Sequence, residues 1–233
     1  VMTNTLIVNL IMLLLNFPAP IIFALILNEI RHKFFKKSIH VVTSFPYFFS
    51  WAIYGGIIIA LCDQTTGIMN PILDAFGLSS AEDPVYLMDS QHIWAVIIIS
   101  SIIKTVGWGS IIYMAAIASI DAELYEAAEL DGVTRWQKAV YITLPCIAPT
   151  ITVFLLLNIG RLLSNSFEQF NSLQNAVNLS RSEVLATYIY RLSFSSRRYG
   201  YATAIGLFNS MVSLVLLVLS NFISKKATGR GLF

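Results

Sequence analysis

Residue types that catalyse bond chemistry are sparse in this chain of 233 residues, and they are not arranged for it. The three histidines, His32, His40 and His92, belong to no H-E-x-x-H zinc motif, and no G-x-S-x-G nucleophile turn occurs. Cys62 and Cys146 form neither a C-x-x-C pair nor a metal-binding spacing. The chain also has no Walker phosphate-binding loop. We therefore expect no catalytic residue, no metal ligand and no cofactor in this chain.

Polar and aromatic side chains occur inside otherwise apolar stretches. Lys104 lies about eleven residues into the third stretch, and an ionisable group at that depth indicates a function by default. The equally weighted alternative is a structural role, in which its amine bonds to backbone carbonyls or to a neighbouring helix. Arg161, near the end of the fourth stretch, either extends toward the interface or meets a bound molecule. Trp and Tyr also anchor helices at interfaces, so both roles stay open. The residues that could contact a bound molecule are Trp51, Tyr54, Trp94, Lys104, Trp108, Tyr113, Asn158, Arg161, Asn165, Glu168 and Gln169.

Composition identifies the class of protein to which these residues belong. Hydrophobic residues make up 56% of the chain and charged residues only 12%, about half the charged fraction of a soluble domain. This excludes an ordinary globular protein and also a disordered one, which needs low hydrophobicity and high net charge. A net charge of +2 is too small for a nucleic-acid binder that relies on charge. The chain is therefore expected to be an integral membrane protein.

Five apolar stretches are each near the ~20 residues that a helix needs to cross the hydrocarbon of a bilayer. No stretch alternates polar and apolar residues over ten positions, as the strands of a membrane barrel do. We therefore expect an all-α helical bundle that forms a single transmembrane domain over residues 1–233. Its expected spans are residues 6–27, 45–61, 93–120, 146–163 and 201–223.

Short basic loops lie on the cytoplasmic side of membrane proteins and so set the orientation. Residues 29–40 and the tail after residue 223 are basic, so both are expected on the cytoplasmic side. Residues 63–89 contain acids but no Lys or Arg, and they are expected on the outer side. This parity leaves residue 1 outside, so we expect five of six helices, with an earlier span before residue 1. The basic residues are Arg31, Lys33, Lys36, Lys37, Lys225, Lys226 and Arg230, and the acids are Asp63, Asp74, Glu82, Asp83 and Asp89.

The loop between the third and fourth spans, residues 121–145, predicts two helices joined by a glycine turn. Asp121 is placed to cap the first helix, and Gly132 to end it in a left-handed conformation. Thr134 and Gln137 have the spacing of a capping box that starts the second helix. Pro145 then stands where the next membrane helix is expected to begin.

This loop is acidic although it is expected to be cytoplasmic. A helix that lies on a lipid surface is typically rich in Lys and Arg, whereas this loop carries five acids against two bases. An interfacial hairpin on the bilayer is one interpretation, and docking to a protein with basic residues is the favoured one. The acids are Asp121, Glu123, Glu126, Glu129 and Asp131, and the bases are Arg135 and Lys138.

The loop resembles the EAA signature of the permease subunits of bacterial ABC importers. Glu126-Ala127-Ala128 is followed by three residues, Gly132, nine residues and 142–145 (Ile-Thr-Leu-Pro), and matches every fixed position. The resemblance implies a type I importer permease whose loop is a coupling helix that docks into a cytoplasmic ATPase. It assigns this role to Glu126, Ala127, Ala128, Asp131, Gly132, Leu144 and Pro145.

Further segments resemble the subgroup of these permeases that imports oligosaccharides and polysaccharide fragments across the bacterial cytoplasmic membrane. They are residues 17–29, 45–51, 107–113, 187–191 and 199–208. The resemblance implies several partners: a second permease that is related but not identical, two ATPase subunits that hold ATP and Mg²⁺, and an extracytoplasmic binding protein. Membrane lipid surrounds the chain, and nucleic acid is not expected. The alternatives are a secondary transporter, which the absence of a visible internal repeat disfavours, and a membrane enzyme without a recognisable motif.

Overall fold

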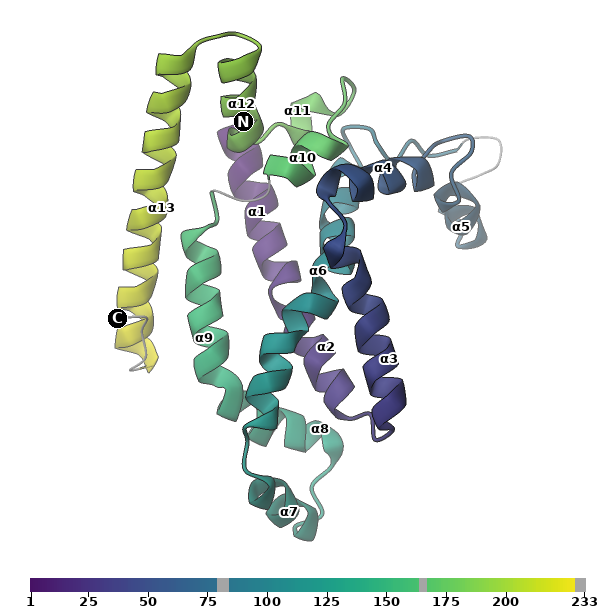
Figure 1. Ribbon diagram of the computed structural model, residues 1–233, viewed down its shortest axis with the longest axis vertical. Coiled ribbons are helices and arrows are strands. Elements are labelled where there is room, and N and C mark those ends of the chain that lie inside the picture. The colour runs from purple at the N-terminus through teal and green to yellow at the C-terminus, as the bar shows by residue number, and fades with distance from the viewer. Residues whose placement is uncertain (79–83, 164–166, 229–233) are drawn as a thin grey trace. The chain divides into compact units, whose positions relative to one another are not determined.

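The computed structural model describes residues 1–78, 84–163 and 167–228, and these residues form helices and connecting turns without any strand (Figure 1). The expected all-α class is thereby confirmed. Glu82, Asp83 and Arg230, used above for orientation, lie outside the described residues. The helices are α1 (Met2–Asn16), α2 (Pro18–Asn28), α3 (Lys33–Ser44), α4 (Trp51–Leu61), α5 (Met69–Ala75), α6 (Ile93–Ala118), α7 (Ala122–Leu130), α8 (Arg135–Lys138), α9 (Leu144–Gly160), α10 (Phe167–Leu173), α11 (Leu179–Ser182), α12 (Leu185–Phe194) and α13 (Tyr199–Thr228).

Four helical segments among the described residues are long and apolar enough to cross a membrane. The first joins α1 and α2 through Phe17, whose backbone stays helical, and the second is α6. The third runs from α8 into α9, and the fourth is α13. They coincide with four of the five expected stretches. Their bounds are Met2–Asn28, Ile93–Ala118, Arg135–Gly160 and Tyr199–Lys226.

The remaining expected span, residues 45–61, is not one straight helix. Helix α3 already begins at Lys33, continues as a 3₁₀ turn over Phe45–Phe48 and then meets α4 at an angle of 103°. Ser50 is extended and starts α4 afresh, because its hydroxyl accepts a bond from Ile53 N at 3.3 Å. Hydropathy alone does not reveal the bend, since the segments on its two sides, Phe45–Phe48 and Trp51–Leu61, are both apolar. A fifth span exists only if this bent pair counts as one.

The span expected to begin at residue 146 is also different, because it is continuous with the second helix of the preceding loop. A π-helical turn over Ala139–Thr143 links α8 to α9, and Leu144 N bonds to Ala139 O, five residues back. Pro145 follows in the first turn of α9. Proline lacks an N–H and crowds the carbonyl four residues before it, so the wider turn accommodates it without ending the helix.

The chain folds into two compact units. Unit 1 consists of Val1–Met12, Phe48–Ser101 and Leu162–Ser213, and in it α10 packs against α4 and α12. Ile93 and Ile97 of α6 and Phe170 and Leu173 of α10 are fully buried in unit 1 and provide its apolar core.

Unit 2 consists of Leu13–Tyr47, Ile102–Arg161 and Leu214–Phe233, with a core drawn from α2, α6 and α9. In this unit the Gly107 backbone lies so close to Thr43 of α3 that an added Cβ would overlap the Thr43 carbonyl. His40 Nε2 also contacts Gly107 O at 3.1 Å. Small residues therefore permit close packing of helices here. The core cluster is Ile21, Ala24, Tyr113, Ile117 and Ile147.

Candidate functional site

The 121–145 loop lies in unit 2, where α7 and α8 follow the end of α6 (Figure 1). Asp121 caps α7, because its carboxylate accepts a bond from Glu123 N at 3.1 Å. Gly132 has φ of +70°. Its N–H bonds to Glu129 O at 3.1 Å, and Val133 N bonds to Ala128 O at 3.1 Å, which is the Schellman ending of a helix. The expected cap and the expected left-handed glycine are both confirmed.

The second helix of the loop starts with the expected capping box. Thr134 N donates to Gln137 Oε1 at 2.8 Å, and Gln137 N donates to the Thr134 hydroxyl at 3.4 Å. These bonds satisfy backbone donors that the first turn of a helix leaves unpaired. The turn between the two helices is therefore fixed by local bonds on both sides.

Two further contacts hold α7 against the following helix, and the sequence did not predict them. Tyr125 Oη lies 2.9 Å from Thr143 Oγ1, and Lys138 Nζ donates to Glu129 Oε1 at 2.6 Å. The Lys138 ammonium holds the pKa of the Glu129 carboxyl below its usual value, through the hydrogen bond and its charge. In the sequence, only the presence of both acidic and basic residues in the loop indicates that such an ion pair could form. The bond to Lys138 neutralises Glu129, one of the five acids of the loop.

The face of α7 directed away from these contacts combines acid with exposed apolar surface. Glu126 and Ala127 are exposed on α7, and so is Asp131 just after it. Leu124 is 49% exposed and Leu130 is 91% exposed, so apolar surface lies beside the exposed carboxylates on this helix. The remaining residues of the signature differ: Ala128 is buried, Leu144 packs against the unit 2 core, and Pro145 is exposed.

In unit 1, two of the residues expected to contact a bound molecule are internal. Tyr54 Oη donates to Ser100 O at 3.0 Å, and Gln169 Nε2 donates to Ile97 O at 2.7 Å, both at buried positions. Trp51 is half-buried with its ring edge-on to Tyr54, and Glu168 is exposed in the first turn of α10. Trp94 Nε1 donates to the Arg181 carbonyl at 2.9 Å. Asn165 lies outside the described residues.

In unit 2, the amine of Lys104 bonds to backbone carbonyls, as expected if Lys104 has a structural role. It is 4% exposed, and its ammonium donates to Pro46 O at 2.9 Å and to Tyr47 O at 3.3 Å. These carbonyls lie in the 3₁₀ turn at the end of α3, where the chain bends away and helix acceptors lose their usual donors. Lys104 therefore stabilises the bend between α3 and α4.

The other unit 2 candidates divide into buried and exposed positions. Tyr113 is buried in the core cluster, with its ring 6.2 Å from that of Phe154. Trp108 is 42% exposed and stacks on Tyr47 at 4.8 Å with nearly parallel rings. Asn158 and Arg161 are exposed at the end of α9, and Asn158 Nδ2 donates to Phe154 O one turn earlier.

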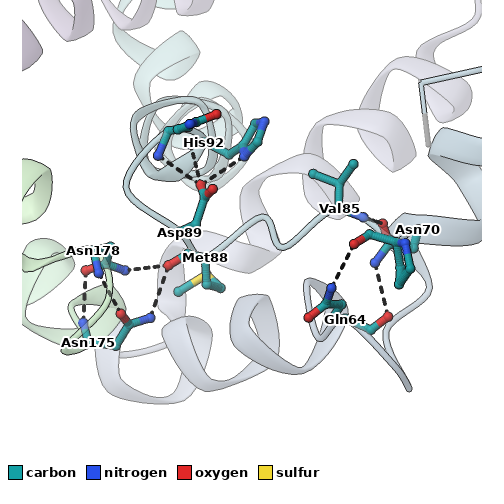
Figure 2. A network of polar contacts seen from close by, with 10 residues as sticks. Gln64, Asn70, Val85, Met88, Asp89, His92, Asn175 and Asn178 are labelled. Carbon is teal, nitrogen blue, oxygen red and sulfur yellow. Dashed lines mark hydrogen bonds and ion pairs between the residues drawn. The ribbon is translucent and has the colours of Figure 1, made fainter. Parts of the chain in front are cut away.

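A network of polar bonds in unit 1, which we term the Met88 network, was not predicted either (Figure 2). Its members are Gln64, Asn70, Pro84, Val85, Met88, Asp89, His92, Asn175 and Asn178. Met88 O accepts from Asn178 Nδ2 at 3.0 Å and from Asn175 Nδ2 at 3.2 Å. Asp89 caps the approach to α6 by accepting from His92 N at 2.8 Å and contacts the His92 ring at 2.9 Å. These bonds fix the segment before α6 against the turn after α10.

The same segment is fixed at its start by two further side chains. Asn70 accepts from Val85 N at 3.1 Å, and Gln64 Nε2 donates to Pro84 O at 2.8 Å (Figure 2). Asp63, two residues after the end of α4, accepts bonds from the backbone and hydroxyl groups of Thr66 and Thr65. These donors lower the pKa of Asp63 to about 2.

The chain belongs to the family of binding-protein-dependent transport system inner membrane components, whose model matches residues 3–229. It is thus a multi-pass permease subunit of an inner membrane. Protein LplB of Bacillus subtilis (strain 168) is 39% identical over 230 residues, which cover 99% of this chain and 71% of that protein.

Two further comparisons agree with this family. The polygalacturonan/rhamnogalacturonan transport system permease protein YteP of the same organism is 36% identical over 99% of this chain and 71% of its own length. A solved structure of a bacterial alginate ABC transporter, in complex with an alginate pentasaccharide-bound periplasmic protein, has a TM-score of 0.92 and 39% identity. The match covers 99% of this chain and 79% of that one. The resemblance noted in the sequence is thereby confirmed.

Proposed function

We propose that this chain forms part of a pore that imports an oligosaccharide or polysaccharide fragment, driven by ATP hydrolysis on separate subunits. The names of its relatives support a carbohydrate substrate, since they transport polygalacturonan or rhamnogalacturonan, and alginate. A related, non-identical permease completes the pore, and two ATPase subunits supply ATP and Mg²⁺. An extracytoplasmic binding protein delivers the substrate. The chain acts as a single permease domain and contributes no catalytic residue.

The observation that carries the proposal is the rigidly held, exposed face of α7. Both ends of α7 are capped, and Tyr125 bonds it to the helix that enters the membrane, so α7 and this helix move together. Glu126 and the nearby apolar side chains of Leu124 and Leu130 remain uncovered within the chain. An acidic and apolar ridge of this kind fits a cleft with apolar walls and a basic rim on a cytoplasmic ATPase. Closure of two ATPase subunits would then rotate the membrane helices.

The substrate path is proposed to use candidates that are not buried. In unit 2 these are Trp108, Asn158 and Arg161, and in unit 1 they are the half-buried Trp51 and the exposed Glu168, acting through hydrogen bonds, charge or stacking. Sugar binding uses aromatic faces together with several hydrogen-bonding groups in a preformed cavity. Tyr54, Lys104, Tyr113 and Gln169 are proposed to support this path from within, because their polar groups or rings already have partners inside the chain or are buried in its core.

The decisive test substitutes Gly132 in the assembled transporter. Gly132→Val places a branched side chain at φ of +70°, so the turn must distort although no atom lies within 4 Å of the added Cβ. We expect weaker ATPase docking, or ATP hydrolysis that no longer drives uptake. Gly206→Val is the matched control, since its Cβ also has open space but its φ is not positive. Gly132→Asn should retain partial coupling, because asparagine tolerates this conformation.

A second test removes the charge of Glu126. Truncating one partner of a buried, hydrogen-bonded charge pair at an interface costs about 2–5 kcal/mol. Glu126→Ala should therefore weaken docking while membrane insertion and capture of the binding protein persist. Asp74→Ala, an exposed acid outside the loop, is the control. Reconstitution with the ATPase, with hydrolysis and uptake measured together, reads both outcomes. Normal coupled transport in both Glu126→Ala and Gly132→Val would contradict the assignment.

A further inference from the structure

Unit 2 contains an apolar groove beside the 121–145 loop that the import mechanism does not use. Its volume is about 510 Å³. One wall is a single stripe of α2, in which the lining residues recur at helical spacing from Pro18 to Glu29. The other wall is the start of the helix after the loop, at Arg135, Trp136, Ala139 and Leu144. The lining residues of α2 are Pro18, Ile21, Ile22, Leu25 and Ile26, and Glu29 lines the groove from the C-cap position just after α2.

The groove is apolar at one end and charged at the other. Its deep end adjoins the core, where Ile21 and Leu144 pack. Its mouth is formed by Glu29 and Arg135, whose carboxylate and guanidinium are 3.8 Å apart. Trp136 stands beside them with 77% of its surface exposed, as tryptophan does at the boundary between hydrocarbon and water. An occupant that matches this profile has an apolar tail and a polar head.

The length of the groove indicates what kind of amphiphile fits. Helix α2 has 11 residues, so at 1.5 Å per residue its stripe is about 16 Å long. This is about half of the roughly 30 Å hydrocarbon thickness, the depth of one leaflet. A transmembrane helix of a partner would cross both leaflets and would not end at a charged rim. An acyl chain of one leaflet ends where this groove ends.

The charge at the mouth favours an anionic head group. Arg135 is exposed, and so are Arg31 and Lys33, which follow Glu29 closely in the sequence, whereas Glu29 is the only acid among the residues that line the groove. A guanidinium has five N–H donors, so Arg135 can meet Glu29 on one side and a phosphate on another. Basic pockets at the cytoplasmic ends of membrane helices bind anionic lipids by this chemistry.

We propose that this groove binds an anionic phospholipid of the cytoplasmic leaflet, with an acyl chain along α2 and its phosphate on Arg135. The choice of the cytoplasmic leaflet depends on the proposed function, in which the 121–145 loop faces a cytoplasmic ATPase. The lipid head then lies against the first turn of the helix that begins at Thr134, directly after the turn at Gly132. Bound lipid therefore stabilises the junction between the 121–145 loop and α2.

Photolabelling of the intact transporter tests the proposal. The complete complex, in vesicles, receives phosphatidylglycerol, phosphatidylcholine or diacylglycerol with a photoreactive group in one acyl chain. Adducts are then mapped by mass spectrometry. We expect phosphatidylglycerol to label the peptides of α2 and α8 about fivefold more than the other two probes, the factor for one favourable surface charge. Arg135→Gln should remove this preference while labelling by the acyl chain persists.

Filling the groove provides the second arm. Ile22 is 54% exposed within it, so Ile22→Trp should occupy the space and reduce labelling at least about fivefold, with Ile26→Trp as a second variant if Ile22→Trp assembles poorly. Leu219→Trp is the matched control, since Leu219 is 52% exposed on α13 outside the groove.

Three outcomes would overturn the proposal: equal labelling by all three probes, no adduct in α2 or α8, or labelling that survives both groove-filling variants. ATPase coupling is measured separately in the Gly132 and Glu126 variants, so failure here leaves that test standing.

Discussion

In the 121–145 loop, each side-chain hydrogen bond within the loop joins residues no more than 18 positions apart, whereas in the Met88 network Asn178 reaches a carbonyl 90 positions away. The loop is built from a capping aspartate, a glycine turn and a capping box, with Tyr125 and Lys138 holding α7 in place. The Met88 network joins the segment before α6 to the turn after α10, which meet only when unit 1 has folded (Figure 2).

This difference has a physical consequence. Local caps form as soon as their own few residues become helical, so they specify the loop almost independently of the rest of the chain. Long-range bonds require the loop-closure entropy between distant segments to be overcome first, so they form together with the core. Disruption of the network should destabilise unit 1 as a whole, whereas disruption of the loop should change its position and its coupling.

The largest expected effect is that of Asn178→Ala in the Met88 network. Asn178 is fully buried and donates to Met88 O and Leu173 O, while its Oδ1 accepts from Asn175 N and from the Ser182 hydroxyl. Each buried group left without a partner costs about 1–3 kcal/mol, so the variant should lose roughly 3 kcal/mol of unfolding free energy. Thermal unfolding of the purified transporter in detergent measures the loss.

Two variants sharpen this result. Asn158→Ala is the matched control: Asn158 is exposed, its side chain bonds to Phe154 O of its own helix, and the change should alter stability by less than about 0.5 kcal/mol. Asn178→Asp keeps the acceptor oxygen and loses the donors, so it should still destabilise. Equal stability of Asn178→Ala and Asn158→Ala would remove the contrast between long-range and local bonds.

An intermediate effect is expected for Tyr125→Phe in the loop. The change removes one hydrogen bond, worth about 1 kcal/mol, and leaves the Thr143 hydroxyl close to Lys138 O at 3.4 Å. Hydrogen exchange should accelerate in the peptides of α7 and leave those of unit 1 unchanged. Tyr141→Phe, at a position 74% exposed, serves as the control. Accelerated exchange throughout unit 1 would show that the loop is not an independent element.

The features that could be predicted from the sequence are those that depend on local contacts, and the features that could not are those that depend on long-range contacts. The Asp121 cap, the left-handed Gly132 and the Thr134 capping box depend on neighbouring residues, and all three were predictable. The bend between α3 and α4 was not, because the segments next to it, Phe45–Phe48 and Trp51–Leu61, are both apolar and the Pro46 carbonyl is satisfied by Lys104, 58 positions later. For the same reason the sequence left the role of Lys104 open. Hydropathy located four spans, but it could not show that α8 and α9 are one helix.

The smallest expected effect is that of Glu129→Gln, which breaks the ion pair with Lys138. The folded loop lowers the pKa of Glu129 from its ordinary value of 4.5, so the pair stabilises the loop at and above that pH and is lost as the pH falls below it. At pH 7 the variant should exchange its Gly132 and Val133 amides faster by a factor of roughly two to three, because exposed pairs contribute little. As the pH falls through the lowered pKa of Glu129, wild type and variant should come to exchange alike, since the carboxyl of the wild type becomes protonated. Each comparison is made at one pH, so intrinsic exchange rates cancel.

Lys138→Met should reproduce the pattern from the other side of the pair. A difference that persists unchanged at low pH would mean that Glu129 holds the turn by its shape or hydrogen bonding and not by its charge.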